Sequence, residues 1–267
     1  IALPDGRFRP GESVPVTLYL AAPHRLETNL FLVLQLLDEN GRAIGNVTTH
    51  PGWGRLPTSM WEPGHIYEDH YEVLISQPID QRSPLRASVY VTFARPEDTA
   101  APLQAYSADG APASPMVGQV DVIPARPPTR ANSGLLPVEV TFGDGIRLTG
   151  QRVPAAASAG GELPVALLWE VQAAPQEDYT AFVHLLDANG TRLAGFDEPP
   201  AANRYPTPFW QPGDRVLSEL VLALPADLPA GDYGLWAGLY PSESAGEARL
   251  PVVASDRTVQ NQSVLLG

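Results

Sequence analysis

Apolar and polar residues alternate along this chain in short runs, and this pattern predicts β-strands. The clearest run is 65–75. Tyr71 and Val73 fall on one face of that segment, while Glu68 and Glu72 fall on the other. A period of two with one apolar face is typical of a half-buried antiparallel strand. Apolar residues do not recur at the i, i+3, i+4, i+7 spacing of an amphipathic helix over a useful length, so we expect very little helix.

The other predicted strands are also short, and prolines and glycines that favour turns lie between them. In the first half we expect strands at 14–20, 29–37, 42–48, 65–75, 86–93 and 119–123. In the second half we expect them at 138–142, 146–148, 163–171, 179–187, 216–224, 233–240, 249–253 and 259–266. Many short strands joined by turns, without crossover helices, indicate an all-β chain of antiparallel sandwiches.

The sequence contains an internal repeat. Residues 15–64 and 164–213 align at one constant offset without a gap. The alignment superposes LLDENG on LLDANG, and PTSMWEPG on PTPFWQPG. A shared register over about fifty residues indicates two copies of one fold unit.

We therefore predict two tandem β-sandwiches, immunoglobulin-like or jelly-roll-like, at residues 1–124 and 135–267. A proline-rich segment at 125–134 would link them and be fairly stiff. The segment VEVTFGDGIRL at 138–148 has no counterpart at the start of the first copy. Either the first copy lacks this strand, or the sequence begins within it.

Composition excludes several classes of function. The formal net charge is −13 and all 17 basic residues are arginines, so a nucleic-acid partner is not expected. Cysteine is absent, which excludes disulfides, thiolate metal sites and cysteine nucleophiles. Without an apolar run of about 18 residues, we expect no membrane span in this stretch. The sequence starts at Ile1 without a signal-peptide pattern, and we expect a processed or excised piece of a longer protein.

The DxNG motifs that begin at Asp38 and Asp187 could suggest calcium loops. An EF-hand loop needs oxygen ligands at alternating positions, glycine at position six and an acidic residue at position twelve. Here glycine comes fourth, and the twelfth positions are Thr49 and Glu198. We interpret both motifs as hairpin turns, in which Asn-Gly supplies the positive φ angles.

His65, Asp69 and His70 could be read as a metal cluster. The two histidines are five residues apart on a predicted strand, so they point to opposite faces and cannot chelate one ion locally. His184 lies within an apolar strand, where a packing or network role is the commoner one. We therefore predict no metal site and no cofactor.

Glycoside hydrolysis needs two carboxylates about 5 to 9.5 Å apart across the scissile bond. Asp197-Glu198 and Glu68 with Glu72 are candidate pairs, but the first copy has Thr48-Thr49 in place of Asp197-Glu198. Surface charge is therefore the favoured interpretation of these carboxylates. The chain has no nucleophile elbow, P-loop or Rossmann glycine pattern, and it lacks lysine for Schiff-base chemistry. We predict no catalytic residues and no enzyme activity.

Trp61 and Trp210 precede Pro-Gly in matching loops, and Trp53 and Tyr205 lie near them in sequence. These four aromatic residues could form a platform that stacks on sugar rings. Alternatively, each tryptophan of the matched pair plugs the end of its own sandwich, with its N–H bonded to a carbonyl. Recurrence in both copies favours the plug. Trp53 aligns with Ala202 and is the better platform candidate.

Trp236 and Tyr240 share one face of the predicted strand at 233–240. The pattern of residues around them leaves open which face of that strand is buried.

The second copy resembles a known module in the segments FGDGIRLTG, GGELPVALLW, DYTAFVHLLDANG, YPTPFWQPGD and AGDYGLWAGLY. It is similar to the β-sandwich domains that follow the multi-helix region of bacterial glycosyltransferases of the dolichyl-phosphate-mannose-mannosyltransferase type, and that occur in bacterial surface proteins. The resemblance covers 138–253 and is weaker over 11–93, where Gln35 replaces His184 and Leu20 replaces Trp169. It implies an extracytoplasmic accessory domain and supplies no catalytic residue.

The leading hypothesis is a non-catalytic, extracytoplasmic accessory or interaction module of a larger bacterial envelope protein, with glycan binding as its more specific form. Its partner would be a polysaccharide or an envelope protein, and the parent protein would be membrane-anchored. The alternative is a glycan-active enzyme whose carboxylates lie between the two sandwiches.

Overall fold

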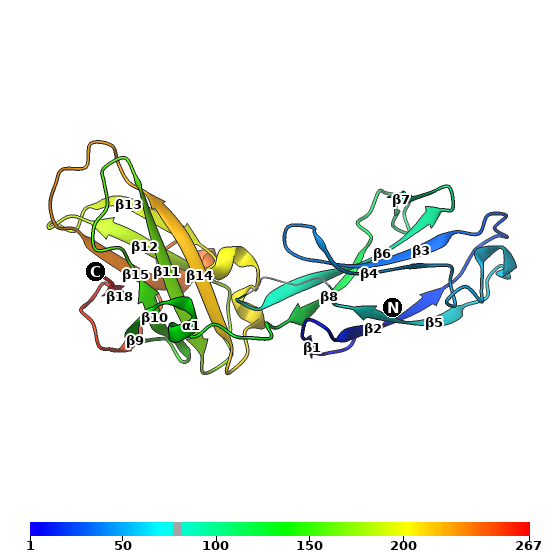
Figure 1. Cartoon of the computed structure of the whole chain (residues 1–267), viewed down its shortest axis with the longest axis horizontal. Helices are drawn as coiled ribbons and strands as arrows, with labels where there is room; N and C mark the ends of the chain where they lie inside the picture. The colour runs from blue at the N-terminus through cyan, green and yellow to red at the C-terminus, as the bar shows by residue number, and fades with distance from the viewer. Residues whose placement is uncertain (77–81) are drawn as a thin grey trace. The chain divides into compact units, whose positions relative to one another are not determined.

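The computed structural model describes residues 1–76 and 82–267. The described chain forms two compact units. The first consists of the chain up to the undescribed stretch together with Leu85–Ala125. The second consists of Arg82–Pro84 and Arg126–Gly267. Nearly all regular structure in both units is β-strand, as the alternating sequence pattern predicts (Figure 1).

The first unit is a sandwich of a six-stranded sheet and a two-stranded sheet. The larger sheet has the order β1-β8-β6-β3-β4, with β7 paired to β6, and the smaller sheet pairs β2 with β5. All pairs are antiparallel except β1 with β8. The strands are β1 Arg7–Phe8, β2 Ser13–Leu20, β3 Phe31–Leu37, β4 Ala43–Thr49, β5 Tyr67–Leu74, β6 Leu85–Arg95, β7 Asp98–Pro102 and β8 Met116–Val122.

The second unit is a sandwich of two five-stranded sheets. Their orders are β14-β11-β10-β9-β16 and β13-β12-β15-β18-β17. The strands are β9 Leu136–Phe142, β10 Ile146–Arg152, β11 Glu162–Val171, β12 Tyr179–Leu186, β13 Arg192–Glu198, β14 Arg215–Ala223, β15 Gly234–Pro241, β16 Val252–Ser255, β17 Val259–Gln260 and β18 Ser263–Leu265. The fold class predicted from the sequence, tandem antiparallel β-sandwiches, is confirmed.

Helical structure in the described chain is limited to single turns. The α-helix α1, Arg130–Ser133, lies within the segment that was expected to be only a linker. Thr129 caps it by accepting a hydrogen bond from the Asn132 backbone N–H, and Gly134 ends it at φ 62°. The other turns are the 3-10 helices η1 Thr58–Met60, η2 Pro200–Asn203, η3 Thr207–Phe209 and η4 Ser242–Ser244. No helix of the described chain has the length and apolar character needed to cross a membrane.

The internal repeat is visible in the strand register. Val16 pairs with Tyr71 in the first unit, and Val165 pairs with Leu220 at the same offset in the second. The turns η1 and η3 also occupy matching positions. The second unit carries the additional pair β9–β10 beside β11, whereas β2 in the first unit is joined on that side by the isolated Ala2–Thr17 bridge.

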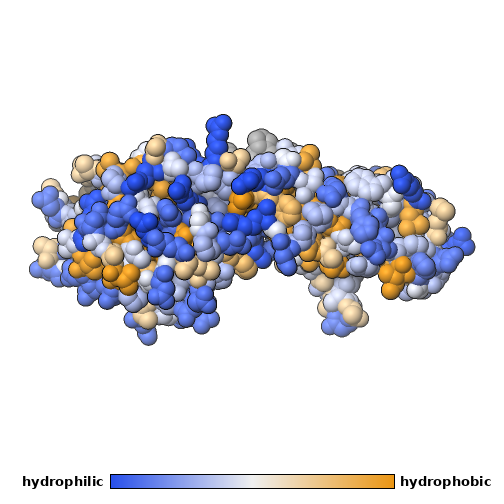
Figure 2. Space-filling view, turned by 90° about the horizontal axis from the view of Figure 1, so that it is seen from below, coloured by the Kyte–Doolittle hydropathy of each residue, from blue (hydrophilic) through white to orange (hydrophobic). Residues whose placement is uncertain are grey.

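Each unit has its own apolar core between its two sheets. In the first unit Val16 of β2 and Leu34 of β3 are fully buried, and in the second unit Leu167 of β11 and Val183 of β12 are fully buried. On the outside, hydrophobic residues lie in small groups separated by hydrophilic ones on the face shown in Figure 2. The alternate residues of the inner strands therefore build the cores, and their neighbours are left for the outer faces.

Candidate functional site

The matched tryptophans Trp61 and Trp210 are buried, with exposed fractions of 4% and 1%. Each indole closes its own loop: Trp61 Nε1 donates to the Leu56 carbonyl at 3.1 Å, and Trp210 Nε1 donates to the Tyr205 carbonyl at 2.7 Å. Tyr205 is also fully buried. Buried rings have no face to offer a sugar, so Trp61, Tyr205 and Trp210 cannot form the glycan platform considered above.

Trp53 differs from these three because its ring is 52% exposed. Its backbone is in the left-handed region at φ 54°, and its Nε1 donates to the His70 carbonyl at 2.9 Å. One edge of the indole is therefore tied to strand β5, and the ring lies 5.4 Å from the ring of Tyr71, while about half of the residue stays exposed. Trp53 remains a candidate for stacking on a sugar ring, but Trp61, Tyr205 and Trp210 are buried and cannot join it.

The residues considered for metal binding do not converge. Asp69 points inward, where it accepts hydrogen bonds from the Gly52 backbone N–H and from the hydroxyl of Tyr71. His70 points outward, and its Nδ1 lies 2.9 Å from the Thr17 hydroxyl. Across residues 1–76 and 82–267, no group of three His, Cys, Asp or Glu side chains could hold an ion.

The DxNG motifs are hairpin turns, as predicted. Asp187 Oδ1 accepts the backbone N–H groups of Asn189 at 2.9 Å and Thr191 at 2.8 Å. The Asp38 carboxylate makes the equivalent bonds in the first unit. The backbone hydrogen bond from Thr191 is the main cause that lowers the pKa of Asp187.

The candidate carboxylate pairs lack the geometry for glycoside hydrolysis. Asp197 and Glu198 are neighbours on β13, so their side chains leave opposite faces of the sheet. Glu68 and Glu72 share the outer face of β5 but are separated by four residues, or about 13 Å along a strand. That distance exceeds the about 9.5 Å upper limit for two carboxylates that flank one bond.

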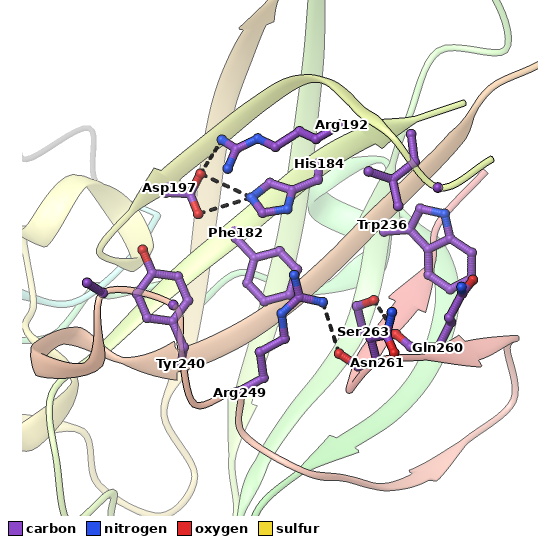
Figure 3. A pocket seen from close by; sticks show the side chains of 14 residues that line it. Phe182, His184, Arg192, Asp197, Trp236, Tyr240, Arg249, Gln260, Asn261 and Ser263 are labelled. Carbon is purple, nitrogen blue, oxygen red and sulfur yellow. Dashed lines mark hydrogen bonds and ion pairs between the residues drawn. The ribbon is translucent and has the colours of Figure 1, made fainter. Parts of the chain in front are cut away.

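A concave site lies on the outer face of the second unit's sheet β13-β12-β15-β18-β17 (Figure 3). Ala181, Val183 and Leu185 of β12 point into the core, which turns Phe182 and His184 outward. The outward face is covered in part by the segment after β15, which contributes Arg249 and Asn261. Between this segment and the sheet lies a cavity of about 350 Å³.

Three aromatic side chains and several polar groups line this cavity. Phe182 comes from β12, and Trp236 and Tyr240 come from β15. The sequence did not decide which face of β15 is buried, and the structure shows that Trp236 and Tyr240 lie on its outer face. The polar groups are His184, Arg192, Asp197, Arg249, Gln260, Asn261 and Ser263. Flat apolar surfaces therefore lie beside groups that can donate and accept hydrogen bonds (Figure 3).

His184, Asp197 and Arg192 form a network at one side of the cavity. His184 Nε2 lies 3.0 and 3.1 Å from the two carboxylate oxygens of Asp197, and Arg192 binds the same carboxylate. Burial lowers the pKa of His184, although the hydrogen bond and charge of Asp197 act in the opposite direction. The neutral imidazole must then carry its hydrogen on Nε2 to donate to Asp197.

Arg249 and Phe182 stack on one another at the floor of the cavity, and Gly238 leaves room for the Phe182 ring. The Arg249 guanidinium lies 4.5 Å from the centre of the Phe182 ring, and it donates to the Asn261 carbonyl at 2.9 Å. The ring lies over Gly238, where an added Cβ would be only 2.5 Å from Phe182 Cζ. A glycine within a strand marks a place where another group approaches the backbone closely, and here that group is the Phe182 ring.

The corresponding face of the first unit has different residues. Gln35 pairs with Tyr90 where His184 pairs with Trp236. Thr48 stands at the aligned position of Asp197. The histidine–carboxylate pair is therefore specific to the second unit.

Sequence reasoning anticipated part of this site. It expected a packing or network role for His184, and the hydrogen bonds to Asp197 show that the imidazole takes part in a network. It interpreted Asp197 as solvated surface charge, but the side chain is only 26% exposed and binds two partners. The signal that could have revealed the pair was that positions 184 and 197 both differ from the first copy.

No protein-family model matches this chain, and no curated protein matches it.

Proposed function

We propose that the second unit is a non-catalytic glycan-binding module and that the cavity on its outer sheet face holds a sugar residue. The observation that carries the proposal is that Trp236, Tyr240 and the Phe182–Arg249 stack line the same cavity as several hydrogen-bonding side chains. Sugar rings present apolar C–H faces and polar hydroxyls, and this combination matches both.

The size of the cavity fits a small ligand. Its volume of about 350 Å³ is at the lower end of the about 300–1,000 Å³ typical of ligand pockets. Asp197, held by His184 and Arg192, keeps its oxygens in fixed directions. A fixed acceptor is suited to selecting a hydroxyl because little order has to be created on binding.

The same residues argue against catalysis at this cavity. Among the described residues, Asp197 is the only carboxylate that lines it, whereas both common routes of glycoside hydrolysis use two. In the described chain the imidazole of His184 is hydrogen-bonded through Nε2 to Asp197 and not to a serine hydroxyl, so the pair does not form a nucleophile–base relay. Binding without turnover is the function that this chemistry supports.

We further propose that the module is extracytoplasmic and accessory to a larger envelope protein. The support is the resemblance of residues 138–253 to the domains that follow the helices of polytopic glycosyltransferases. The partner of such a module would be a polysaccharide of the envelope, and this matches the aromatic cavity.

A glycan array probed with the whole 267-residue chain tests the proposal, followed by titration of the strongest hit. Trp236→Ala should weaken that binding at least about tenfold, because a buried aromatic contact is a typical dominant contribution to affinity. Trp53→Ala, which removes an exposed ring in the other unit, is the matched control and should not change it.

Two results would contradict the proposal. One is an array without any saturable binding, which would leave a spacer role. The other is binding that survives Trp236→Ala but is lost in Trp53→Ala, which would move the site to the first unit. Thermal melting of both variants shows whether a loss of binding comes from unfolding.

A further inference from the structure

A second cavity, of about 790 Å³, lies at one end of the second unit. Leu163 of β11 and Leu224 just after β14 line it from one sheet. Leu185 of β12 and Leu235 of β15 line it from the other sheet. The cavity therefore reaches the space between the two sheets, where these four leucines form its apolar part, and Asp232, Tyr233 and Arg257 also line it.

One residue that lines this cavity holds a buried polar atom without a hydrogen-bond partner. Gln151 of β10 is 4% exposed, and its Nε2 donates to the Leu266 carbonyl at 2.9 Å. A carbonyl can only accept, so this bond fixes which end of the amide is nitrogen. The other end, Gln151 Oε1, is buried without a hydrogen bond.

The position of Gln151 makes this acceptor unusual. Its neighbour across the ladder is Leu167, which belongs to the apolar core. Buried polar atoms are nearly always hydrogen-bonded, because an unsatisfied one loses its bonds to water and gains nothing in return. A single water is a poor substitute here, since it needs two to four polar partners and the four leucines between the sheets supply none.

We propose that this cavity binds an amphiphile: an alkyl chain lies between the sheets, and a hydroxyl or amide N–H on it donates to Gln151 Oε1. The leucines supply the apolar contact, and the unpartnered oxygen supplies the one directional bond. An apolar surface beside a few placed polar groups is the usual form of a small-molecule site. This site is separate from the aromatic cavity and does not depend on glycan binding.

The test compares two isomeric probes, 1-octanol and heptyl methyl ether, which have the same number of heavy atoms but differ in the O–H donor. Each is titrated into the ¹⁵N-labelled full chain, and amide shifts are followed by NMR. We expect saturable shifts at Leu163, Gln151 and Leu266, with 1-octanol binding up to about tenfold more tightly than the ether.

Two variants test the hydrogen bond to Gln151 and the apolar contact within the cavity separately. Gln151→Leu removes the acceptor but keeps a core-sized side chain, so it should bind both probes equally. Leu224→Trp should obstruct the part of the cavity between the sheets and weaken both probes together. Gln151→Met is a second acceptor-free variant, to be used if thermal melting shows that Gln151→Leu is unfolded.

The proposal is overturned if 1-octanol gives no saturable shifts around the cavity, or if the two probes bind wild type equally. It is also overturned if an acceptor-free variant still prefers the alcohol. A long-lived water at Gln151 that persists in saturating 1-octanol would show that the oxygen serves hydration alone.

Discussion

If Trp210 closes the end of its own sandwich, its truncation should destabilise the second unit by a predictable amount. The indole is 1% exposed within the core of the second unit, and its Nε1 bonds the Tyr205 carbonyl at 2.7 Å. Truncating a buried tryptophan to alanine costs about 3–5 kcal/mol. Loss of the N–H donor adds to this, because the Tyr205 carbonyl is buried with the loop.

A loss of this size is a large part of the stability of one domain, typically about 5–15 kcal/mol. For a unit of this length, about 1 kcal/mol shifts the melting temperature by roughly 2–4 °C. Trp210→Ala should therefore lower the melting temperature of the second unit by on the order of 10 °C.

Differential scanning calorimetry of the full chain measures this shift. Trp53→Ala is the control, since it removes an indole that is 52% exposed and should leave melting nearly unchanged. Trp210→Phe should fall between wild type and Trp210→Ala, because it keeps much of the ring but lacks the N–H. A Trp210→Ala chain that melts within about 2 °C of wild type would refute the plug role.

Two further predictions concern the aromatic cavity. The folded state keeps the pKa of His184 below its ordinary value of about 6.5, so the unfolded chain binds the proton more tightly and stability falls as pH drops through 6.5. His184→Gln should reduce this loss between pH 7 and pH 5 in urea unfolding, and an unchanged pH slope would contradict the assignment. Gly238→Ala should destabilise the second unit by about 1–3 kcal/mol because its Cβ would meet the Phe182 ring at 2.5 Å, and wild-type unfolding in urea would contradict this.

The alternation of residues predicted the strands well where one face is buried and failed where it is not. Strand β5 follows the pattern closely, with Asp69, Tyr71 and Val73 on its buried face. Strand β7 was not predicted, because all five of its residues are exposed and nothing in their pattern marks a face. Helix α1 was missed for a related reason, since four residues are too few to show a helical period.

The His184–Asp197 pair could not be derived from the sequence because it depends on a bulge. Near the turn Leu186 pairs with Arg192, but after one extra residue Leu185 pairs with Ala194 and His184 with Gly195. If the register of the Leu186–Arg192 pair continued without the bulge, Glu198 rather than Asp197 would share the face of His184, because a shift of one position exchanges the two faces of a strand.

Comparison with the first unit shows that the bulge is common to both sandwiches, whereas the His184–Asp197 pair is not. The first unit has the same bulge, between the pairs Leu37–Ala43 and Leu36–Gly45. The bulge there brings Gln35 and Thr48 to the outer face, so the strand geometry is shared while the chemistry is not. A bulge present in both copies is explained by the hairpin alone, but a buried histidine with a carboxylate partner in one copy is not. This difference favours a ligand as the reason for the pair, because the sandwich forms without it in the other unit.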